Sequence, residues 1–458
     1  MVVLLNKNWR LGRTDKSRSR ALYAVASLVL ILTGFLYISQ GPEISPVDEH
    51  VHIDYALKSG QLQLPAENER LSQQTMRIMA CTRLDVEGLY ISPCENEEFN
   101  PDVYPDFGYN TASEAQPTYY LITGLFARTL RAVTPIEDLL FSLRLTNWLW
   151  IVLASLLLLR ELIRSEVRSF LSLGLTLVFA LNPVVLAAGI HVGPDAALPL
   201  AGWVLFKIAT TSFLNFKSVT VLSFLAGIML TIDRAVGLAF SMALLILVMR
   251  ICYQTWVTFN KTREFLPSAV RLDLLLLLGM LGSFVVVPSL MSSARRIYSG
   301  STGSRSVVLP RDEWFQRPSF SFEGIFDGFW RVFPPVDATS GGYIIPPLRG
   351  LEISVFSHLI GTVLVGGVFT LIASRDNVRV HIPAIAAFTI GVFSFPILNL
   401  ALWLNGGSVW QLIPRFTLAP VMVYFYLTGR ALRSNSSQML VGTLMIFFSF
   451  IVCWRVIF

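Results

Sequence analysis

The sequence predicts an all-α protein that crosses a membrane many times, and its composition is the first observation behind this prediction. Apolar residues make up 53% of the 458 residues and charged residues only 14%, against about 45–50% and about 25% in soluble globular chains. The mean hydropathy is +0.59. A soluble protein this apolar could not cover its surface with polar groups, so soluble enzymes, collagens, coiled coils, disordered chains and disulfide scaffolds are excluded.

The second observation is a series of apolar runs. A helix needs about 20 apolar residues to cross the hydrocarbon core of a bilayer, and about eleven segments of the chain approach this length. They are residues 21–39, 143–159, 169–188, 195–212, 218–232, 236–253, 272–290, 353–373, 382–403, 413–429 and 438–458. The fifth segment is short, and the stretch 169–212 can be divided in more than one way. We therefore expect a bundle of about eleven transmembrane helices.

The positions of the basic residues predict the orientation. The first apolar run follows a basic leader and is not followed by an A-x-A-like cleavage site, so we expect an uncleaved anchor with a cytoplasmic N-terminus. Alternating the spans from there places just over half of the 36 Lys and Arg residues in short cytoplasmic segments, as the positive-inside rule requires. The net charge of +6 is then a sign of topology, and we expect no nucleic-acid partner.

Two segments on the predicted outer side are too long to be simple connectors. Part of the first, residues 118–133, has one apolar face with basic residues near one end, the pattern of a helix that lies in the membrane interface. The second is rich in aromatic residues, which suit sugar stacking or a lid, or equally anchoring at the interface. The predicted organisation is a cytoplasmic leader (1–20), an N-terminal transmembrane module (21–291) that includes the first outer loop (40–142), a second outer loop (292–352) and C-terminal transmembrane helices (353–458).

The four cysteines are of two kinds. Cys81 and Cys94 both lie in the first outer loop, thirteen residues apart, and two thiols in an oxidising compartment can pair. We expect them to form a disulfide. Cys252 and Cys453 fall within predicted spans, where buried thiols are usually unreactive core residues.

The strongest chemical signal follows the first span, in the segment 46–52 (PVDEHVH). If a helix begins here, Asp48 and His52 are four residues apart and share one face. Such a cluster can act as a general base, can bind a divalent metal through Asp48 and His52, or can do both. The plain alternative is that Asp48 and Glu49 stabilise the first turn of a helix, and that His52 is a hydrogen-bonded interfacial histidine.

Further candidates lie at the predicted outer ends of later spans. Asp195 begins the fourth span and can orient an acceptor, or simply stabilise a helix N-terminus. Arg144, Arg234 and Arg415 lie on the predicted outer side, where cytoplasmic retention cannot explain them. They are candidate clamps for a phosphate group, although Arg234 can instead pair with its neighbour Asp233.

The order of these motifs resembles that of a known group of enzymes. The carboxylate pair after the first span, with His52 three residues beyond Glu49, is similar to the first-loop motif of GT-C-type membrane glycosyltransferases. It is closer still to the Pro-x-Asp-Glu-x-x-His signature of a bacterial family of uncharacterised multispanning proteins. Further segments that resemble motifs of that family are 116–120 (QPTYY), 181–195 with its Asn182-Pro183 and Gly193-Pro194-Asp195, and 414–416 (PRF). The chain departs from the family pattern by one proline in the first of these, by Gly193 in place of Asn, and by Phe416 in place of Tyr.

The resemblance implies a GT-C-like fold and inverting transfer of a sugar from a polyprenyl-phosphate donor to a glycan, lipid or protein acceptor. The reaction would take place on the extracytoplasmic face of the plasma (inner) membrane. Asp48 is then the expected base, and Glu49 is the second choice or orients the acceptor. No P-loop or G-x-G-x-x-G motif argues for a nucleotide-sugar donor, and a divalent metal is the only cofactor left open. The residues expected to contact substrate or phosphate are His52, Gln116, Tyr119, Arg144, Asp195, Arg234 and Arg415.

Two other functions stay open at this point. A transporter or flippase of lipid-linked glycans would more often show internal repeats and charged residues in mid-span, and the sequence shows neither. A non-catalytic assembly partner in the membrane would use the two outer loops for contacts and would need no shared pocket.

Overall fold

The computed structural model describes residues 13–45, 48–66, 69–82, 93–211, 215–262, 268–298, 348, 351–374, 378–404 and 417–457. Helices hold 84% of these residues, and no strand occurs among them. Arg70 and Tyr109 form an isolated antiparallel bridge. The all-α class predicted from composition is therefore confirmed for the part of the chain that is described.

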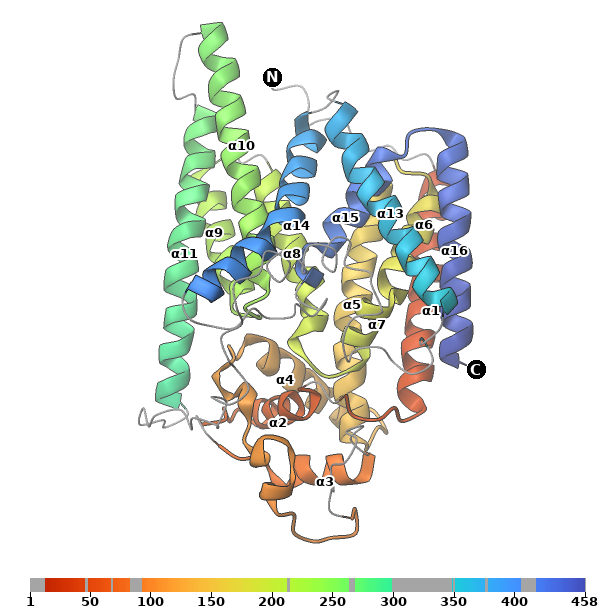
Figure 1. Ribbon diagram of the computed structural model, residues 1–458, viewed down its shortest axis with the longest axis vertical. Coiled ribbons are helices and arrows are strands. Elements are labelled where there is room, and N and C mark those ends of the chain that lie inside the picture. The colour runs from red at the N-terminus through yellow and green to blue at the C-terminus, as the bar shows by residue number, and fades with distance from the viewer. Residues whose placement is uncertain are drawn as a thin grey trace.

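Long helices form most of the molecule (Figure 1). The longest are α1 (Arg13–Ser39), α5 (Leu139–Arg164), α10 (Val236–Thr262), α11 (Ser268–Tyr298), α13 (Leu351–Ser374), α14 (Val378–Leu404) and α16 (Asn435–Ile457). Shorter α-helices are α2 (Glu49–Gly60), α3 (Gln73–Thr82), α4 (Thr118–Val133), α6 (Ser169–Leu181), α7 (Pro183–Ile190), α8 (Leu198–Thr210), α9 (Phe216–Leu230) and α15 (Leu418–Ala431). Single turns of 3-10 helix are η1 (Pro101–Val103), η2 (Pro105–Gly108), η3 (Thr111–Glu114) and η4 (Pro194–Ala197).

The apolar helices indicate a multi-pass membrane protein. Within the described ranges, six helical segments are long and apolar enough to cross a membrane, or seven if the bent pair α6–α7 forms one span. A helix lies in each of the eleven predicted segments. However, helices of 13–15 residues such as α8 and α9 are only about 20–23 Å long, against a hydrocarbon core of about 30 Å. The eleven-span bundle therefore stays a prediction.

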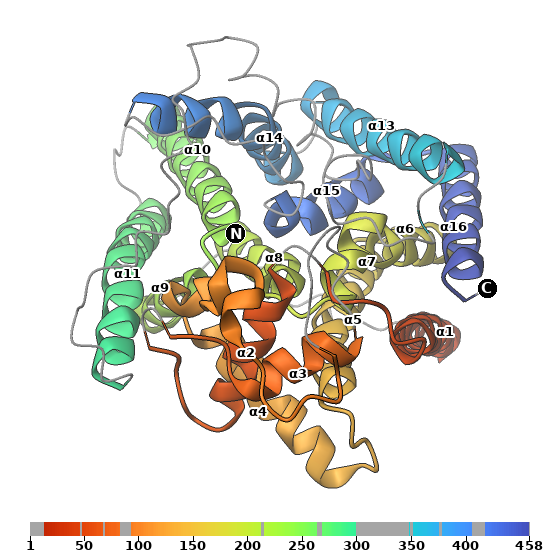
Figure 2. The ribbon, with the colours of Figure 1, turned by 60° about the horizontal axis from the view of Figure 1, so that its bottom comes forward.

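Helices α2, α3 and α4 lie together at one end of the long helices (Figures 1 and 2). We call the described residues from Gln40 to Asp138 the cap. The cap begins after the last residue of α1 and ends before the first residue of α5, so these ends of the two helices are joined to it. Helix α4 forms over the segment for which an amphipathic helix is predicted. One of its faces is buried, and Ile122, Phe126 and Val133 are exposed elsewhere on it; its position at a membrane surface stays a prediction.

Two features hold the cap together. Helices α2 and α4 cross with their backbones in contact, because a side chain at Gly124 would overlap the carbonyl oxygen of Ala56. The buried carboxylate of Asp54 in α2 accepts hydrogen bonds from the backbone N–H of Ser72 (2.8 Å) and the amide of Asn110 (2.8 Å). It also pairs with Lys58 at 2.8 Å. Desolvation raises the pKa of Asp54, but Lys58 and these donors more than offset it, so the pKa lies below its ordinary value.

A break between α6 and α7 shapes the interior below the cap. The two helices are bent by 57° relative to each other. The side chain of Asn182 accepts a hydrogen bond from the backbone N–H of Val184 at 3.0 Å, and Pro183 occupies the first position of α7. An Asn cap followed by Pro is a typical helix start, so the break expected from Asn182-Pro183 has a local cause. It directs the end of α7 and the following turn η4 toward the cap.

The ring of Trp148 in α5 fixes α1 and α7 on either side of it. Its indole N–H donates to the carbonyl oxygen of Leu30 at 2.9 Å, and its side chain is fully buried. Gly34 of α1 and Gly189 of α7 lie so close to the ring that a β-carbon at either position would overlap it. Both glycines are therefore needed for the close approach of these helices.

The contact between α2 and α4 gives a first prediction. Replacing Gly124 by alanine forces the two backbones apart, and such overpacking costs about 1–3 kcal/mol. The Gly124→Ala variant should therefore melt at a lower temperature in detergent than the native protein. The matched control is Gly282→Ala in α11, where nothing lies within 4 Å of the new β-carbon. If Gly124→Ala melts no lower than Gly282→Ala, the backbone contact is not a constraint on the cap.

Candidate functional site

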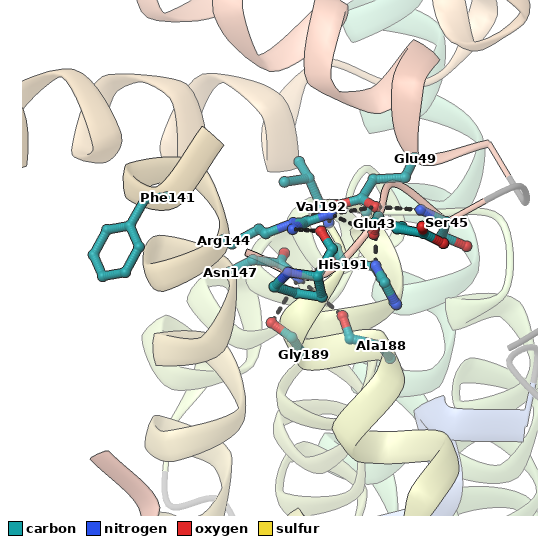
Figure 3. Close-up of polar contacts among 12 residues, drawn as sticks. Glu43, Ser45, Glu49, Phe141, Arg144, Asn147, Ala188, Gly189, His191 and Val192 are labelled. Atoms are coloured by element: carbon teal, nitrogen blue, oxygen red, sulfur yellow. Dashed lines mark hydrogen bonds and ion pairs between the residues drawn. The ribbon is translucent and has the colours of Figure 1, made fainter. Parts of the chain in front are cut away.

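The carboxylate of Glu49, the first residue of α2, forms five hydrogen bonds where the cap meets α5 and the end of α7 (Figure 3). One oxygen, Oε1, accepts from Arg144 Nε at 2.9 Å and from the backbone N–H of Val192 at 3.0 Å. The other, Oε2, is 2.9 Å from His191 Nδ1 and accepts from Arg144 Nη2 at 3.0 Å and from the backbone N–H of Ser45 at 2.7 Å. Glu49 is only 1% exposed. All of its hydrogen-bonding capacity is therefore used within the protein.

Arg144 carries the same network to the segment that follows α1. Its Nη1 donates to the carbonyl oxygen of Pro42 at 2.6 Å and its Nη2 to that of Glu43 at 2.9 Å. The guanidinium comes from the second turn of α5 and is 2% exposed. Burial alone would raise the pKa of Glu49, but Arg144, and after it His191, hold that pKa well below its ordinary value. Glu49 is therefore a charged anchor that joins four segments of the chain.

Asn147, one turn further along α5, fixes the end of α7. Its amide nitrogen donates to the carbonyl oxygens of Ala188 (2.8 Å), Gly189 (3.0 Å) and His191 (2.6 Å). The last carbonyls of a helix have no partner within the helix. This one side chain therefore provides hydrogen-bond donors for several carbonyl oxygens at the end of α7. Its amide oxygen accepts from the hydroxyl of Tyr119 at 2.5 Å.

Tyr119 and Tyr120 connect α4 to this region. The hydroxyl of Tyr119 accepts from the backbone N–H of Gly193 at 3.1 Å. The hydroxyl of Tyr120 is 2.8 Å from His52 Nδ1, and the Tyr120 ring stacks on Tyr55 with ring centres 3.8 Å apart. Both Tyr119 and Tyr120 are fully buried, and burial raises the pKa of each phenol above its ordinary value.

Two acidic residues influence the Tyr120 hydroxyl electrostatically. After burial, the largest influence that raises the Tyr120 pKa is the carboxylate of Asp233, in the turn between α9 and α10, and Asp195 of η4 contributes as well. Asp195 is 6% exposed. The His52 ring also faces η4, since a β-carbon at Gly193 would lie 3.4 Å from His52 Cδ2. The site therefore combines α2, α4, η4 and the α9–α10 turn.

Asp48 directly precedes α2 and has an unusual backbone. Its φ of 62° places it in the left-handed region, which Asp tolerates better than most residues. It occupies the N-cap position of α2, yet its side chain makes no capping hydrogen bond. A carboxylate at this position normally caps the helix. Asp48 therefore does not stabilise the start of α2 as a capping residue.

The other predicted site residues are more dispersed. Gln116 donates to the hydroxyl of Ser292 in α11 at 2.9 Å, and its buried oxygen has no partner in the described part of the chain. Arg234 is exposed in the α9–α10 turn, where its neighbour Asp233 accepts from the backbone N–H of Ala235 at 2.7 Å. Arg415 and nearly all of the second outer loop lie outside the described residues.

The structure joins Cys81 at the end of α3 to Cys94 in a disulfide, with their Cα atoms 4.7 Å apart.

No three His, Cys, Asp or Glu side chains within the described ranges are grouped so that they could hold a metal ion. A metal at Asp48 and His52 would therefore need further ligands from the substrate or from other residues. A half-open pocket of about 280 Å³ next to Arg144 is lined by the end of α1, Cys81 and the start of α5.

Sequence reasoning missed several residues that build the site. His191, Asn147, Tyr55 and Tyr120 were not predicted to have individual roles. Asn147 carried a detectable signal, because a polar amide inside an apolar span needs a partner. His191 carried a weaker one, since it stands two residues before the Gly193-Pro194-Asp195 motif.

No model of a known protein family matches this chain, and a search of curated proteins finds no significant relative.

The buried ion pair gives a second prediction. Removing one partner of such a pair leaves an uncompensated buried charge, which costs about 3–5 kcal/mol. Arg144→Ala should therefore lower the melting temperature strongly. The matched control is Arg164→Ala, which removes an arginine that is 46% exposed in its pair with Glu161 and should cost less than about 1 kcal/mol. Equal effects of the two substitutions would contradict the role assigned to Arg144.

The depressed pKa of Glu49 gives a third prediction. A carboxyl whose pKa is lower in the folded state stabilises the protein above the unfolded-state pKa of about 4.3, and this contribution is lost as the pH falls below that value. Glu49→Gln should melt well below the native protein near neutral pH, because the amide cannot carry the charge that Arg144 requires. Between about pH 5 and pH 3 the gap in melting temperature should narrow. A gap that stays constant over this range would show that the charge of Glu49 does not matter.

Proposed function

We propose that this chain is a GT-C-type glycosyltransferase that moves a sugar from a polyprenyl-phosphate donor to a cell-envelope acceptor. One observation carries the proposal. Three motifs that resemble those of the family, around residues 48–52, 116–120 and 193–195, come from distant parts of the sequence and contact one another. His52 bonds to Tyr120, and Tyr119 bonds to Gly193. These contacts bring the carboxylates, imidazoles and phenols of the three motifs to one place.

Asp48 is the base in this proposal. Its neighbour Glu49 is closed off by five hydrogen bonds, which favours a positioning role for Glu49 over the alternative of a second base. In the reaction, the acceptor hydroxyl gives its proton to the Asp48 carboxylate as the acceptor oxygen bonds to the sugar C1 atom. The bond from C1 to the phosphate oxygen breaks, the polyprenyl phosphate leaves, and the configuration at C1 inverts.

The leaving phosphate needs cations to stabilise its charge. Arg144 is a poor candidate for this task, because its guanidinium is buried and already bonded to Glu49, Pro42 and Glu43. Arg234, which is exposed in the α9–α10 turn, and Arg415 remain the proposed phosphate ligands. The cap would lie on the extracytoplasmic side of the plasma membrane, opposite a cytoplasmic N-terminus.

A flippase of lipid-linked glycans is the second candidate, and the break between α6 and α7 is the observation that favours it. Transporters often build their binding sites from discontinuous helices near the middle of the membrane. A flippase would bind polyprenyl-phosphate sugars without breaking the bond between sugar and phosphate. The two candidates therefore differ in whether a labelled sugar is released from the lipid.

The proposal predicts that Asp48→Asn abolishes sugar transfer. Asparagine is also tolerated in the left-handed region, so the backbone should be preserved while the basic group is lost. Loss of a general base lowers the rate by about 10²–10⁴-fold. The measurement is transfer of label from polyprenyl-phosphate sugars by the purified full-length protein in lipid, with native melting temperature as the check on folding.

Glu43→Gln is the matched control, because Glu43 is an exposed carboxylate in the same segment and should transfer sugar at the native rate. Full transfer by Asp48→Asn, or the absence of transfer from every donor by the native protein, would refute the proposal.

A further inference from the structure

His191 follows the last residue of α7 and has its two ring nitrogens in different situations. Nδ1 lies 2.9 Å from Oε2 of Glu49. Glu49 is ionised, since its pKa is held well below the ordinary value, and a carboxylate can only accept hydrogen bonds. The proton in this bond must therefore belong to Nδ1. Nε2 is then the ring nitrogen left for another partner, and a hydroxyl group can bond to it whether it carries a lone pair or an N–H, because a hydroxyl both donates and accepts.

Nε2 is also open to a ligand. No residue in the described part of the chain forms a hydrogen bond with it, and it is not among the sealed polar atoms of the interior. The side chain of His191 is 11% exposed. His50 differs in both respects, because it is 3% exposed and both of its ring nitrogens are sealed in the interior without a partner among the described residues.

Hydrogen bonds hold the backbone of His191 and of the two residues after it. Its own carbonyl oxygen accepts from Asn147 at 2.6 Å, the next backbone N–H bonds to Glu49, and the one after that bonds to Tyr119. A group fixed in this way does not lose further conformational freedom when it binds a ligand. His191 is therefore held in place for a ligand, beside the contacts of the cap with the residues that lead into η4.

We infer that Nε2 of His191 forms a hydrogen bond with a hydroxyl group of the sugar carried by the lipid donor. This inference rests on the proposed function for the identity of the ligand. A hydroxyl group fits better than an anion, because it can bond to this nitrogen whether the ring is neutral or protonated. The nearby charge is acidic as well: Asp195 is four residues away in η4, and the positive charge of Arg144 is compensated by Glu49.

Chemical footprinting of the full-length protein in lipid nanodiscs tests the contact without measuring activity. Diethyl pyrocarbonate acylates histidine nitrogens that have an accessible lone pair, and mass spectrometry identifies the modified residue. In mildly alkaline buffer, His191 should react and the buried His50 should not. One or more of the polyprenyl-phosphate derivatives of glucose, mannose, galactose and N-acetylglucosamine should slow the acylation of His191 about tenfold. Polyprenyl phosphate without a sugar should not.

The outcomes separate this inference from the proposed function. Equal protection by the lipid with and without sugar, or no reaction of His191 at all, overturns the inference. Sugar transfer by the native protein with no protection by any of the four lipids overturns it too, while the proposed function stands. Protection by a sugar lipid in a protein that transfers no sugar supports the contact and refutes the glycosyltransferase.

Two substitutions at His191 give an independent test, because each preserves one ring nitrogen. Asparagine keeps a donor at the position of Nδ1 and has no hydrogen-bonding atom at Nε2, whereas glutamine places its amide group near Nε2 and loses the donor to Glu49. His191→Asn should keep the native melting temperature but bind the sugar lipid about tenfold more weakly, which corresponds to about 1.4 kcal/mol. His191→Gln should melt lower but bind the sugar lipid nearly as well as the native protein. If binding follows stability in both variants, His191 has only a structural role and the inference fails.

Discussion

The bonded pair of Glu49 and Arg144 is the interaction on which the arrangement below the cap depends. A buried charge is tolerated when it is paired and its remaining hydrogen-bonding positions are satisfied. Here the carboxylate receives two bonds from Arg144, two from backbone N–H groups and one from His191. Through these bonds the segment after α1, the start of α2, the second turn of α5 and the end of α7 are fixed relative to one another. The junction therefore fixes the start of α2, which follows Asp48 and carries His52, against the end of α7.

The same pair gives two adjacent carboxylates different tasks. Glu49 is helical, buried and committed to Arg144, whereas Asp48 adopts a left-handed backbone and does not cap its own helix. Two neighbouring carboxylates in similar surroundings would compete for one cation. Since Glu49 is bonded to Arg144, it holds the backbone beside Asp48 in place, as the proposed role of Asp48 as the base requires. Rigid support of this kind is what a catalytic group needs, because small displacements cost much of its effect.

Local sequence patterns predicted much of the fold, and long-range pairings escaped them. Apolar runs indicated the helices, Asn182-Pro183 indicated the break before α7, and the amphipathic pattern of 118–133 indicated α4. Each of these depends on residues within a few turns of one another. Glu49 and Arg144 are 95 residues apart in the sequence, and the periodicity of apolar residues does not predict such a pair. Seen alone, Arg144 is simply an arginine near a span end, which is why the sequence favoured a phosphate clamp. Which of Asp48 and Glu49 is buried was equally open, because it depends on where the helix starts.

The break between α6 and α7 also bears on the choice between an enzyme and a transporter. Irregular backbone at membrane depth is tolerated where protein groups or a cavity satisfy it, and transporters use such breaks at places that must move. Here Asn147 binds three carbonyl oxygens at the end of α7, Glu49 binds the next N–H and Tyr119 the one after it. To move this terminus, the protein would have to give up five hydrogen bonds and expose a buried carboxylate. A terminus held so firmly suits a site that keeps its geometry through a reaction better than one that must open alternately to the two sides of a membrane.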